Sequence, residues 1–139
     1  MVDREKLRFA LSRQFLLGIV VPPFVVLALN EVASYIYLYD RYPHIDVVMH
    51  LLGGAAIAWS WMTLHTALFS QVILPRWYRI LVPVAIVALA AVSWEFYEFV
   101  FDWRDGAPIR QISIANTMQD LACGLIGGTL VATVRTRES

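Results

Sequence analysis

Residues 51–74 read LLGGAAIAWSWMTLHTALFSQVIL, and no Asp, Glu, Lys or Arg interrupts them. A helix that crosses the hydrocarbon core of a bilayer needs about 20 mostly apolar residues. Within that core every backbone N–H and C=O must be bonded internally, so only a helix or a closed barrel can cross it. The stretch therefore predicts a transmembrane helix, and its apolar character extends the expected span to about residues 45–74.

Three further stretches have the same character. We expect spans at about residues 15–39, with Glu31 as the only charge, at about 80–101, and at about 112–134, interrupted only by Asp120. Short connections make neighbouring helices antiparallel, and the alternating pattern of a membrane barrel is absent. The sequence predicts an all-α fold, a four-helix transmembrane bundle with antiparallel up-down topology, in which residues 1–139 form a single integral membrane domain.

The composition agrees with a membrane protein. Hydrophobic residues make up 59% of the chain and charged residues 16%, with a mean hydropathy of +0.62, whereas soluble domains are about 45–50% apolar and about 25% charged. The formal net charge of zero gives no sign of a nucleic-acid partner. Cys123 is the only cysteine, which excludes an internal disulfide, a thiolate zinc site and a dithiol redox pair.

The basic residues predict the orientation, because Lys and Arg accumulate on the cytoplasmic side. Eight lie in the two tails and the second connection: Arg4, Lys6, Arg8, Arg13, Arg76, Arg79, Arg135 and Arg137. Three lie in the other connections: Arg41, Arg104 and Arg110. We therefore expect a multi-pass protein of the cell membrane with both termini in the cytoplasm.

Most acidic residues gather at the opposite end. Once the helices are laid antiparallel, eight of them fall toward the outer ends: Glu31, Asp40, Asp46, Glu95, Glu98, Asp102, Asp105 and Asp120. At 1.5 Å per residue, most of these lie roughly 5–13 Å below the outer interface. An ionised side chain facing lipid at the centre of the bilayer costs about 3 kcal/mol or more, so we expect the acidic side chains to face the interior of the bundle.

Helical spacing groups these residues into three stripes. The stripes are Asp46 with His50; Glu95 with Glu98 and Asp102; and Asn116 or Thr117 with Asp120, Gly124 and Gly127 or Gly128. Residues three, four or seven apart share a helix face. Gly53 and Gly54 continue the face of His50, and small residues let helices approach closely. The stripes should therefore meet inside the bundle.

One interpretation of the cluster is a divalent-metal site. The candidate ligands are Asp46, His50, Glu95, Glu98 and Asp120, and the candidate catalytic residues among them are Glu95, Glu98 and His50. Oxygen-rich ligand sets suit Mg²⁺, Ca²⁺ or Mn²⁺, and an added imidazole admits Zn²⁺ or Fe²⁺. Such an ion can activate water against a lipid-linked phosphate, which Arg104 or Arg110 could hold. This interpretation predicts a metal-dependent enzyme.

Two other interpretations fit the same residues. A protonated, hydrogen-bonded cluster would hold the helices in register in a non-catalytic structural or accessory subunit. Intramembrane carboxylates also serve cation or proton paths. Membrane lipids are the expected partners in every case, and a partner protein or a homo-oligomer is compatible with each. For His65, packing within its helix is the simpler interpretation.

The three stripes together resemble a known group of proteins. The matching pattern is Asp46-x-x-x-His50-x-x-Gly53, Trp94-Glu95-x-x-Glu98-x-x-x-Asp102 and Asn116-Thr117-x-x-Asp120-Leu121-x-x-Gly124-x-x-x-Gly128. This order resembles the VanZ-like group and related small predicted inner-membrane proteins of unknown function. The resemblance covers about residues 46–128 and implies an intramembrane site without implying a reaction. Some members of that group carry an acidic residue where this chain has Asn116, so a site transferred from them has one carboxylate fewer here.

Overall fold

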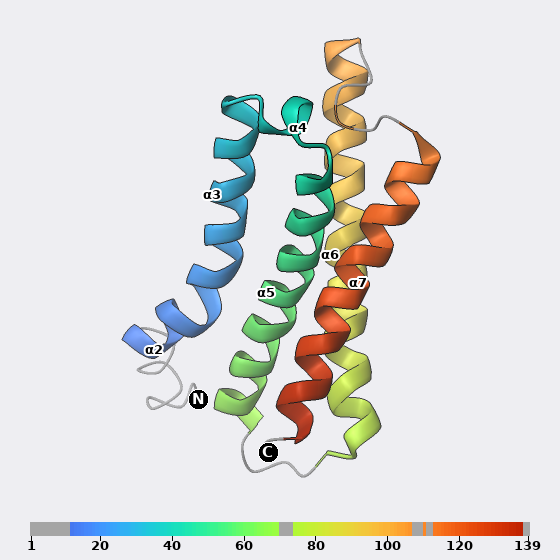
Figure 1. Cartoon of the computed structure of the whole chain (residues 1–139). Helices are drawn as coiled ribbons and strands as arrows, with labels where there is room; N and C mark the ends of the chain where they lie inside the picture. Colours follow the sequence, from blue (N-terminus) through green and yellow to red (C-terminus); the bar gives the residue numbers. More distant parts are fainter. Residues whose placement is uncertain (1–11, 70–73, 107–109, 111–112, 138–139) are drawn as a thin grey trace.

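The computed structural model describes residues 12–69, 74–106, 110 and 113–137, and every regular element within these ranges is a helix. The elements are α2 (Arg13–Phe15), the π-helical turn η1 (Leu16–Val20), α3 (Val21–Tyr35), α4 (Leu38–Arg41), α5 (His44–Phe69), α6 (Arg76–Asp105) and α7 (Ile114–Arg137). In this part of the chain four helices are long and apolar enough to cross a membrane: η1 with α3, then α5, α6 and α7. The prediction of a four-helix transmembrane bundle is confirmed, and the ribbon in Figure 1, rising through α3 and α6 and descending through α5 and α7, is consistent with the antiparallel order.

The first long helix is interrupted next to its two prolines. Pro22 and Pro23 occupy the first turn of α3, and the π-helical turn η1 precedes them directly. Proline has no backbone N–H and its ring clashes with the preceding turn, so the regular hydrogen-bond pattern cannot run through this point. The π-helical turn accommodates the break in the α-helical hydrogen-bond pattern. Below α3 the chain bends away from α5 (Figure 1).

The ends of the helices differ from the expected spans, because hydropathy measures how apolar a segment is and not where its backbone turns. The first helix ends at Tyr35, since Tyr37 adopts a left-handed conformation with φ 56° before α4 begins. Helix α6 runs from Arg76 to Asp105, beyond the apolar stretch at both ends. Residues 70–73 of the second expected span and residue 112 of the fourth lie outside the described residues.

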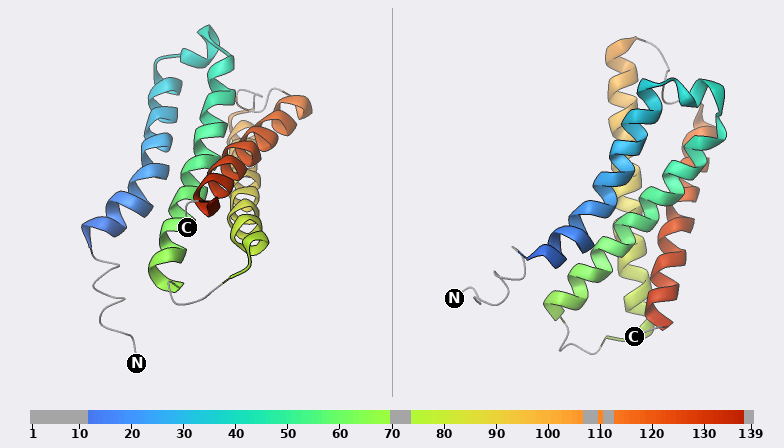
Figure 2. Two further views of the ribbon diagram at one scale, coloured as in Figure 1. Left: turned by 60° about the horizontal axis from the view of Figure 1, so that its bottom comes forward. Right: turned by 60° about the vertical axis from the view of Figure 1, so that its left-hand side comes forward.

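Small residues fill the interior of the bundle and large apolar ones cover its outside. Ala58 and Ala132 are fully buried and Val87 is nearly so, whereas Phe24 and Leu89 are 63% and 69% exposed. Helix α7 packs most extensively on α5 and then on α6, while α3 packs mainly on α5, and both views of Figure 2 show α3 along one side of the bundle. The exposed apolar surface suits lipid as the surroundings of the helices.

Candidate functional site

Glycines bring the backbones of α5 and α7 into direct contact. A Cβ added to Gly54 would overlap the carbonyl oxygen of Gly124, and one added to Gly127 would overlap that of Leu51. Figure 1 shows α5 and α7 running in the same direction, so one register repeats along their contact. It pairs Asp46 with Asn116, His50 with Asp120 and Gly54 with Gly124. The close contact of the glycines therefore places the polar residues one and two turns above them side by side.

Asp46, His50 and Asp120 converge at the upper end of this contact. The Nε2 atom of His50 lies 3.5 Å from Oδ1 of Asp46 and 3.9 Å from Oδ1 of Asp120. One ligand atom from each residue lies within 4.8 Å of the other two. Ligand atoms around one ion with bonds of about 2.1 Å are roughly 3–4 Å apart, so the three side chains fit a divalent cation with small adjustments.

Asn116 holds the two carboxylates of this triad together. Its side-chain Nδ2 donates hydrogen bonds to Oδ2 of Asp120, at 2.7 Å, and to Oδ2 of Asp46, at 3.2 Å. Each carboxylate thus uses one oxygen for Asn116 and turns the other toward His50. The amide orients both acids without occupying the oxygens that would bind an ion, which is the function of an outer-shell residue in many metal sites.

Asp120 is the most buried member of the triad. Its side chain is 4% exposed, against 11% for His50 and 31% for Asp46. Among the residues that the structure describes, none donates a hydrogen bond to Oδ1 of Asp120. A buried carboxylate oxygen without a donor is unfavourable in a membrane protein interior. The triad therefore contains one buried acceptor oxygen that no described residue satisfies with a hydrogen bond.

The two glutamates of α6 lie beside the triad but do not join its three ligand atoms. Glu95 is buried and lies within electrostatic range of Asp120 and Glu98. Glu98 is half-buried, accepts a 2.9 Å hydrogen bond from the Trp94 indole N–H, and lies within electrostatic range of His50. Of the five ligands expected from the sequence, the structure thus brings three together and leaves Glu95 and Glu98 adjacent.

An apolar cavity of about 260 Å³ opens beside the triad. His50 reaches it from α5, and Asn30 and Trp94 are its other large polar-tipped side chains; the rest of the lining is mainly Gly, Ala, Val, Leu, Ile, Met and Pro from α3, α5, α6 and α7. Glu98 does not line the cavity. Trp94, whose indole N–H donates a hydrogen bond to Glu98, does line it. Gly53 faces this cavity, with open space where a Cβ would be, while Gly54 also makes the helix contact.

Tyr39 and Asn30 meet near the upper end of the cavity. The Tyr39 hydroxyl, from the short helix α4, donates a hydrogen bond to Oδ1 of Asn30 in α3. Burial, together with the neighbouring Asp46, Glu98 and Glu31, raises the pKa of Tyr39 to about 12. The hydroxyl therefore stays protonated and remains a donor throughout the physiological range.

The other acidic residues that the structure describes do not belong to the triad. Asp102 is buried and accepts hydrogen bonds from the backbone N–H and the guanidinium of Arg110. Asp105 pairs with Arg110, at 3.4 Å, and with Arg104, at 2.8 Å. Both arginines are thus paired at the end of α6, and we do not assign them to a phosphate. Glu31 and Asp40 are exposed.

Comparison with known proteins identifies the family. Residues 3–138 match the model of the family described as predicted membrane protein (DUF2238). The chain belongs to this family. The match covers nearly the whole chain and supports a small membrane protein of unknown function, but it does not support the VanZ-like group specifically. No curated protein and no solved structure matches the chain.

Two residues near the triad, Tyr39 and Asn116, were not expected from the sequence to contact other helices. Tyr39 resembles an interfacial aromatic anchor, and its contact with Asn30 depends on the turn at Tyr37. Asn116 shares the Asp120 stripe, so its helix face was predictable. Its bond to Asp46 of α5 was not, because that contact depends on how α5 and α7 are rotated against each other.

Proposed function

We propose that this protein binds a divalent metal ion through Asp46, His50 and Asp120 and uses it to hydrolyse a lipid-linked phosphate. The observation that carries the proposal is the buried Oδ1 of Asp120, which lacks a hydrogen-bond donor among the described residues and faces His50. Two carboxylates and one imidazole suit Mg²⁺, Mn²⁺, Ca²⁺ or Zn²⁺. Asn116 would keep both carboxylates turned toward the ion.

The cavity beside His50 supports a substrate with an apolar chain. Its lining is mostly aliphatic, and its polar groups are confined to a few positions that include His50 and Asn30. A lipid chain lying in this cavity would bring its phosphate to the Asp46–His50–Asp120 end. Helices α3 and α6 both line the cavity, yet α3 packs mainly on α5. The chain would therefore enter from the bilayer between α3 and α6.

The bound ion and the two glutamates of α6 would have different roles in the proposed hydrolysis. The bound ion would supply Lewis acidity toward a phosphate oxygen. Glu98, held by the Trp94 indole and within electrostatic range of His50, is the proposed acceptor of a proton from the attacking water. Buried Glu95 would add negative charge beside Asp120 and strengthen attraction for a cation.

Phosphate release from a lipid phosphate tests the enzymatic part. Purified protein in lipid nanodiscs would receive a polyprenyl phosphate or a long-chain alkyl phosphate monoester, together with Mn²⁺, Mg²⁺ or EDTA. We expect metal-dependent release that falls at least about a hundredfold in Glu98→Gln, the loss typical of removing a general base, and also in Asp120→Asn. Glu31→Gln, at an exposed acidic position, should retain activity. Release that survives EDTA, or an unchanged rate in Asp120→Asn, would contradict the proposal.

We place the site at the outer face of the cell membrane, with both termini in the cytoplasm, because of the eight-to-three asymmetry of basic residues. Reporter fusions at Ser139 and at Gly106 should report opposite sides, with Ser139 inside. An external Ser139 would move the triad to the cytoplasmic face and would replace an external lipid phosphate with a cytoplasmic one.

A non-catalytic subunit is the second candidate function. The bridge from Asn116 to Asp46 and Asp120 favours it, because such a network can fix the register of α5 and α7 without any ligand. Intact folding, no metal binding and no phosphate release would favour this candidate, and a partner protein or a second copy of the chain would then be sought. Proton or cation transfer would instead appear as flux across a sealed vesicle that depends on Asp120.

A further inference from the structure

Polar and apolar groups are segregated along the cavity beside the triad. Helices α3, α5 and α6 each line it with one stripe of residues about two turns long, within residues 23–30, 49–57 and 87–94. Helices α3 and α6 rise while α5 descends (Figure 1). Asn30, His50 and Trp94 therefore all lie toward the upper end of their stripes, and the lower ends are apolar. The cavity is thus amphipathic, with its polar end at the level of the triad.

Two of these three polar side chains have roles that the site already explains. The indole N–H of Trp94 donates a hydrogen bond to Glu98. The His50 imidazole belongs to the triad. Asn30 is the third, and its hydrogen-bond partner, Tyr39, does not line the cavity. The function of Asn30 in the cavity is therefore still to be assigned.

Tyr39 orients the side-chain amide of Asn30. The Oδ1 atom of Asn30 accepts a hydrogen bond from the Tyr39 hydroxyl, so the acceptor side of the amide is engaged by the short helix α4. Tyr39 also lies within electrostatic range of Asp46 and Glu98, which places this hydrogen bond at the triad end of the bundle. With Oδ1 fixed in this way, the position of Nδ2 on the same planar amide is fixed as well.

The Nδ2 group of Asn30 offers two N–H donors. Among the residues that the structure describes, none accepts a hydrogen bond from this nitrogen. Amide donors beside aliphatic side chains are unfavourable without an acceptor. A ligand that combines an apolar chain with an oxygen-rich head would satisfy both parts of the cavity, because its chain would contact the aliphatic lining and its head would accept from Asn30.

We propose that Nδ2 of Asn30 donates hydrogen bonds to a phosphate oxygen of the lipid bound in this cavity. The inference rests on the function proposed above, since that function brings a lipid phosphate to the triad end. A neutral amide can bind a phosphate oxygen without pairing with Asp46 or Glu98, as a lysine or an arginine there would. Tyr39 would be a positioning residue, because it acts on the substrate only through Asn30.

Retention of a lipid phosphonate tests this contact separately from catalysis. A long-chain alkylphosphonate has a charged head on a C–P bond that the proposed hydrolysis does not cleave. Purified protein in zwitterionic nanodiscs would be loaded with it, in Mn²⁺ and in EDTA, and analysed by native mass spectrometry. We expect about tenfold weaker retention in Asn30→Ala, the loss typical of a hydrogen bond to a charged group. Asn30→Asp should lose more, because an ionised carboxylate repels the head, and Asn30→Gln, which keeps the donors, should lose less.

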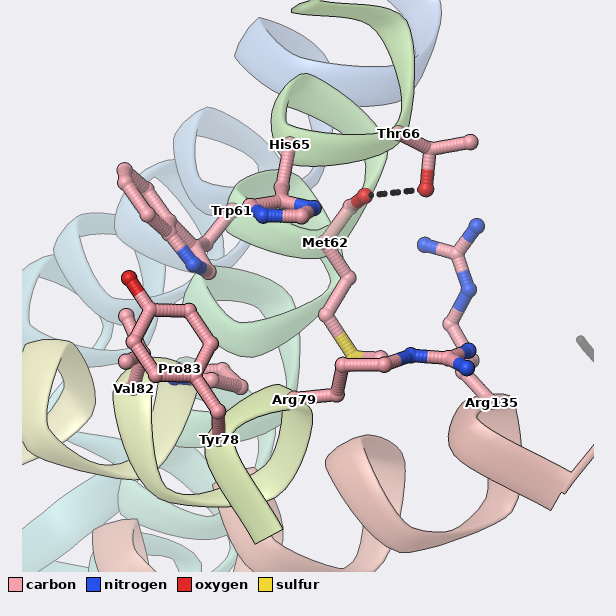
Figure 3. A pocket seen from close by; sticks show the side chains of 9 residues that line it. All are labelled: Trp61, Met62, His65, Thr66, Tyr78, Arg79, Val82, Pro83 and Arg135. Carbon is pink, nitrogen blue, oxygen red and sulfur yellow. Dashed lines mark hydrogen bonds between the residues drawn. The ribbon is translucent and has the colours of Figure 1, made fainter. Parts of the chain in front are cut away.

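Two apolar positions serve as controls. Val26 lines the same cavity one turn below Asn30 on α3. Val82 lines a separate cavity of about 280 Å³ at the opposite end of the bundle, formed by α5, α6 and the end of α7 (Figure 3). That cavity includes His65, about four turns beyond His50 on α5, or roughly 22 Å along the helix. Val26→Ala and Val82→Ala should both retain the phosphonate nearly as well as wild type does.

Two further readouts separate substrate binding from a structural role of Asn30. Bound metal should be the same in Asn30→Ala as in wild type, because Asn30 is not one of the three ligands. Where phosphate is released from a lipid phosphate, Asn30→Ala should raise KM and leave kcat nearly unchanged, as expected when a contact made equally in the ground state and the transition state is removed. Tyr39→Phe should show the same pattern with a smaller rise in KM.

The outcomes distinguish this contact from the enzymatic proposal. Equal retention in wild type, Asn30→Ala and Asn30→Asp would overturn the contact, even where metal binding and phosphate release are found. No retention by wild type in either condition would overturn it too, as would an equal loss in Val26→Ala, which would show that packing of α3 is responsible. Weaker retention in the Asn30 variants alone, without phosphate release by wild type, would support the contact and contradict the enzyme.

Discussion

Two helix contacts in this protein differ in how tightly they are packed. Helices α5 and α7 pack closely, whereas α3 packs loosely on α5. Along the first, Gly54 and Gly124 touch backbone to backbone and Ala58 and Ala132 are fully buried. Along the second, Ala33 is the only buried residue of α3, and side chains as large as Phe24 stay exposed. The first contact leaves no room for adjustment, whereas the second leaves the cavity beside it.

This difference in packing density suggests that the two contacts have different roles. Small residues that let backbones touch fix the relative position of two helices, so Asp46, His50 and Asp120 are held by the tightest part of the bundle. Helix α3 has few buried contacts and packs mainly on α5, so it forms a loosely packed wall of the cavity. A firmly held triad beside a loosely packed wall would suit the lipid-linked substrate that we propose.

The largest expected effect comes from adding a methyl group to the tight contact. Gly54→Ala places a Cβ against the Gly124 carbonyl, which must move, and we expect about 3 kcal/mol of destabilisation. Gly53→Ala is the matched control, because nothing lies within 4 Å of the added Cβ and alanine favours the helix. Unfolding of both variants in mixed micelles measures the difference. Equal stability of the two variants would contradict the tight packing of α5 on α7.

A metal ion should stabilise the same contact. At a concentration one hundred times its Kd, an ion that binds only the folded state adds about 2.7 kcal/mol. We expect this in a thermal melt of wild type with the cognate ion and its loss in Asp120→Asn. The gain should be larger at pH 8 than at pH 6, because protons compete with the metal for its ligands. Glu98→Gln, outside the three ligand atoms, should keep most of the gain.

Removal of the amide bridge should have a smaller effect that depends on metal. Asn116→Ala leaves Asp46 and Asp120 without their shared donor, and we expect about 1.5 kcal/mol of destabilisation without metal. With metal the loss should shrink, because the ion then draws the two carboxylates together. Gln119→Ala, at an exposed position of α7, controls for the change in the helix. A loss that is independent of metal would favour the structural role of the network.

The smallest expected change in stability concerns the hydrogen bond between Tyr39 and Asn30, on the loosely packed α3 side of the bundle. Tyr39→Phe removes the hydrogen bond to Asn30, and we expect a loss of about 1 kcal/mol near neutral pH. The pKa of Tyr39 is raised from 10.0 to about 12, so its stabilising contribution is complete below pH 10 and disappears as the pH rises to about 12. Melts over this range should first bring wild type and Tyr39→Phe together and then make Tyr39→Phe the more stable of the two. A constant gap between them would show that the hydroxyl does not titrate as stated.

Much of the fold was predictable because bilayer thickness imposes strong constraints on the chain. The uncharged run at residues 51–74 and its counterparts led directly to four helices. The ends of the helices were less predictable, since the turn at Tyr37 depends on backbone conformation and not on hydropathy. The i, i+4 spacing likewise placed Asp46 and His50 on one face before any tertiary contact was considered.

The sequence predicted which helix face carries each candidate residue. It did not predict how the helices are rotated and shifted against one another. Asp120 meets His50 because Gly54 and Gly124 set the register of α5 on α7, and a glycine spacing alone does not say which helix it contacts. Glu95 and Glu98 share a stripe as expected, yet their helix places them beside the three ligand atoms and not among them. Spacing within one helix therefore supplied the candidates, and packing between helices selected three of them.

Direct measurement of metal stoichiometry tests the proposed site most directly. Purified protein would be dialysed against Mn²⁺, Mg²⁺, Ca²⁺ and Zn²⁺ in turn and analysed for bound metal, beside Asp120→Asn and the exposed control Glu31→Gln. We expect one tightly bound ion per chain for at least one of these metals in wild type and Glu31→Gln, and its loss in Asp120→Asn. Absence of bound metal in wild type, or equal binding in folded Asp120→Asn, would contradict a metal site formed by Asp46, His50 and Asp120.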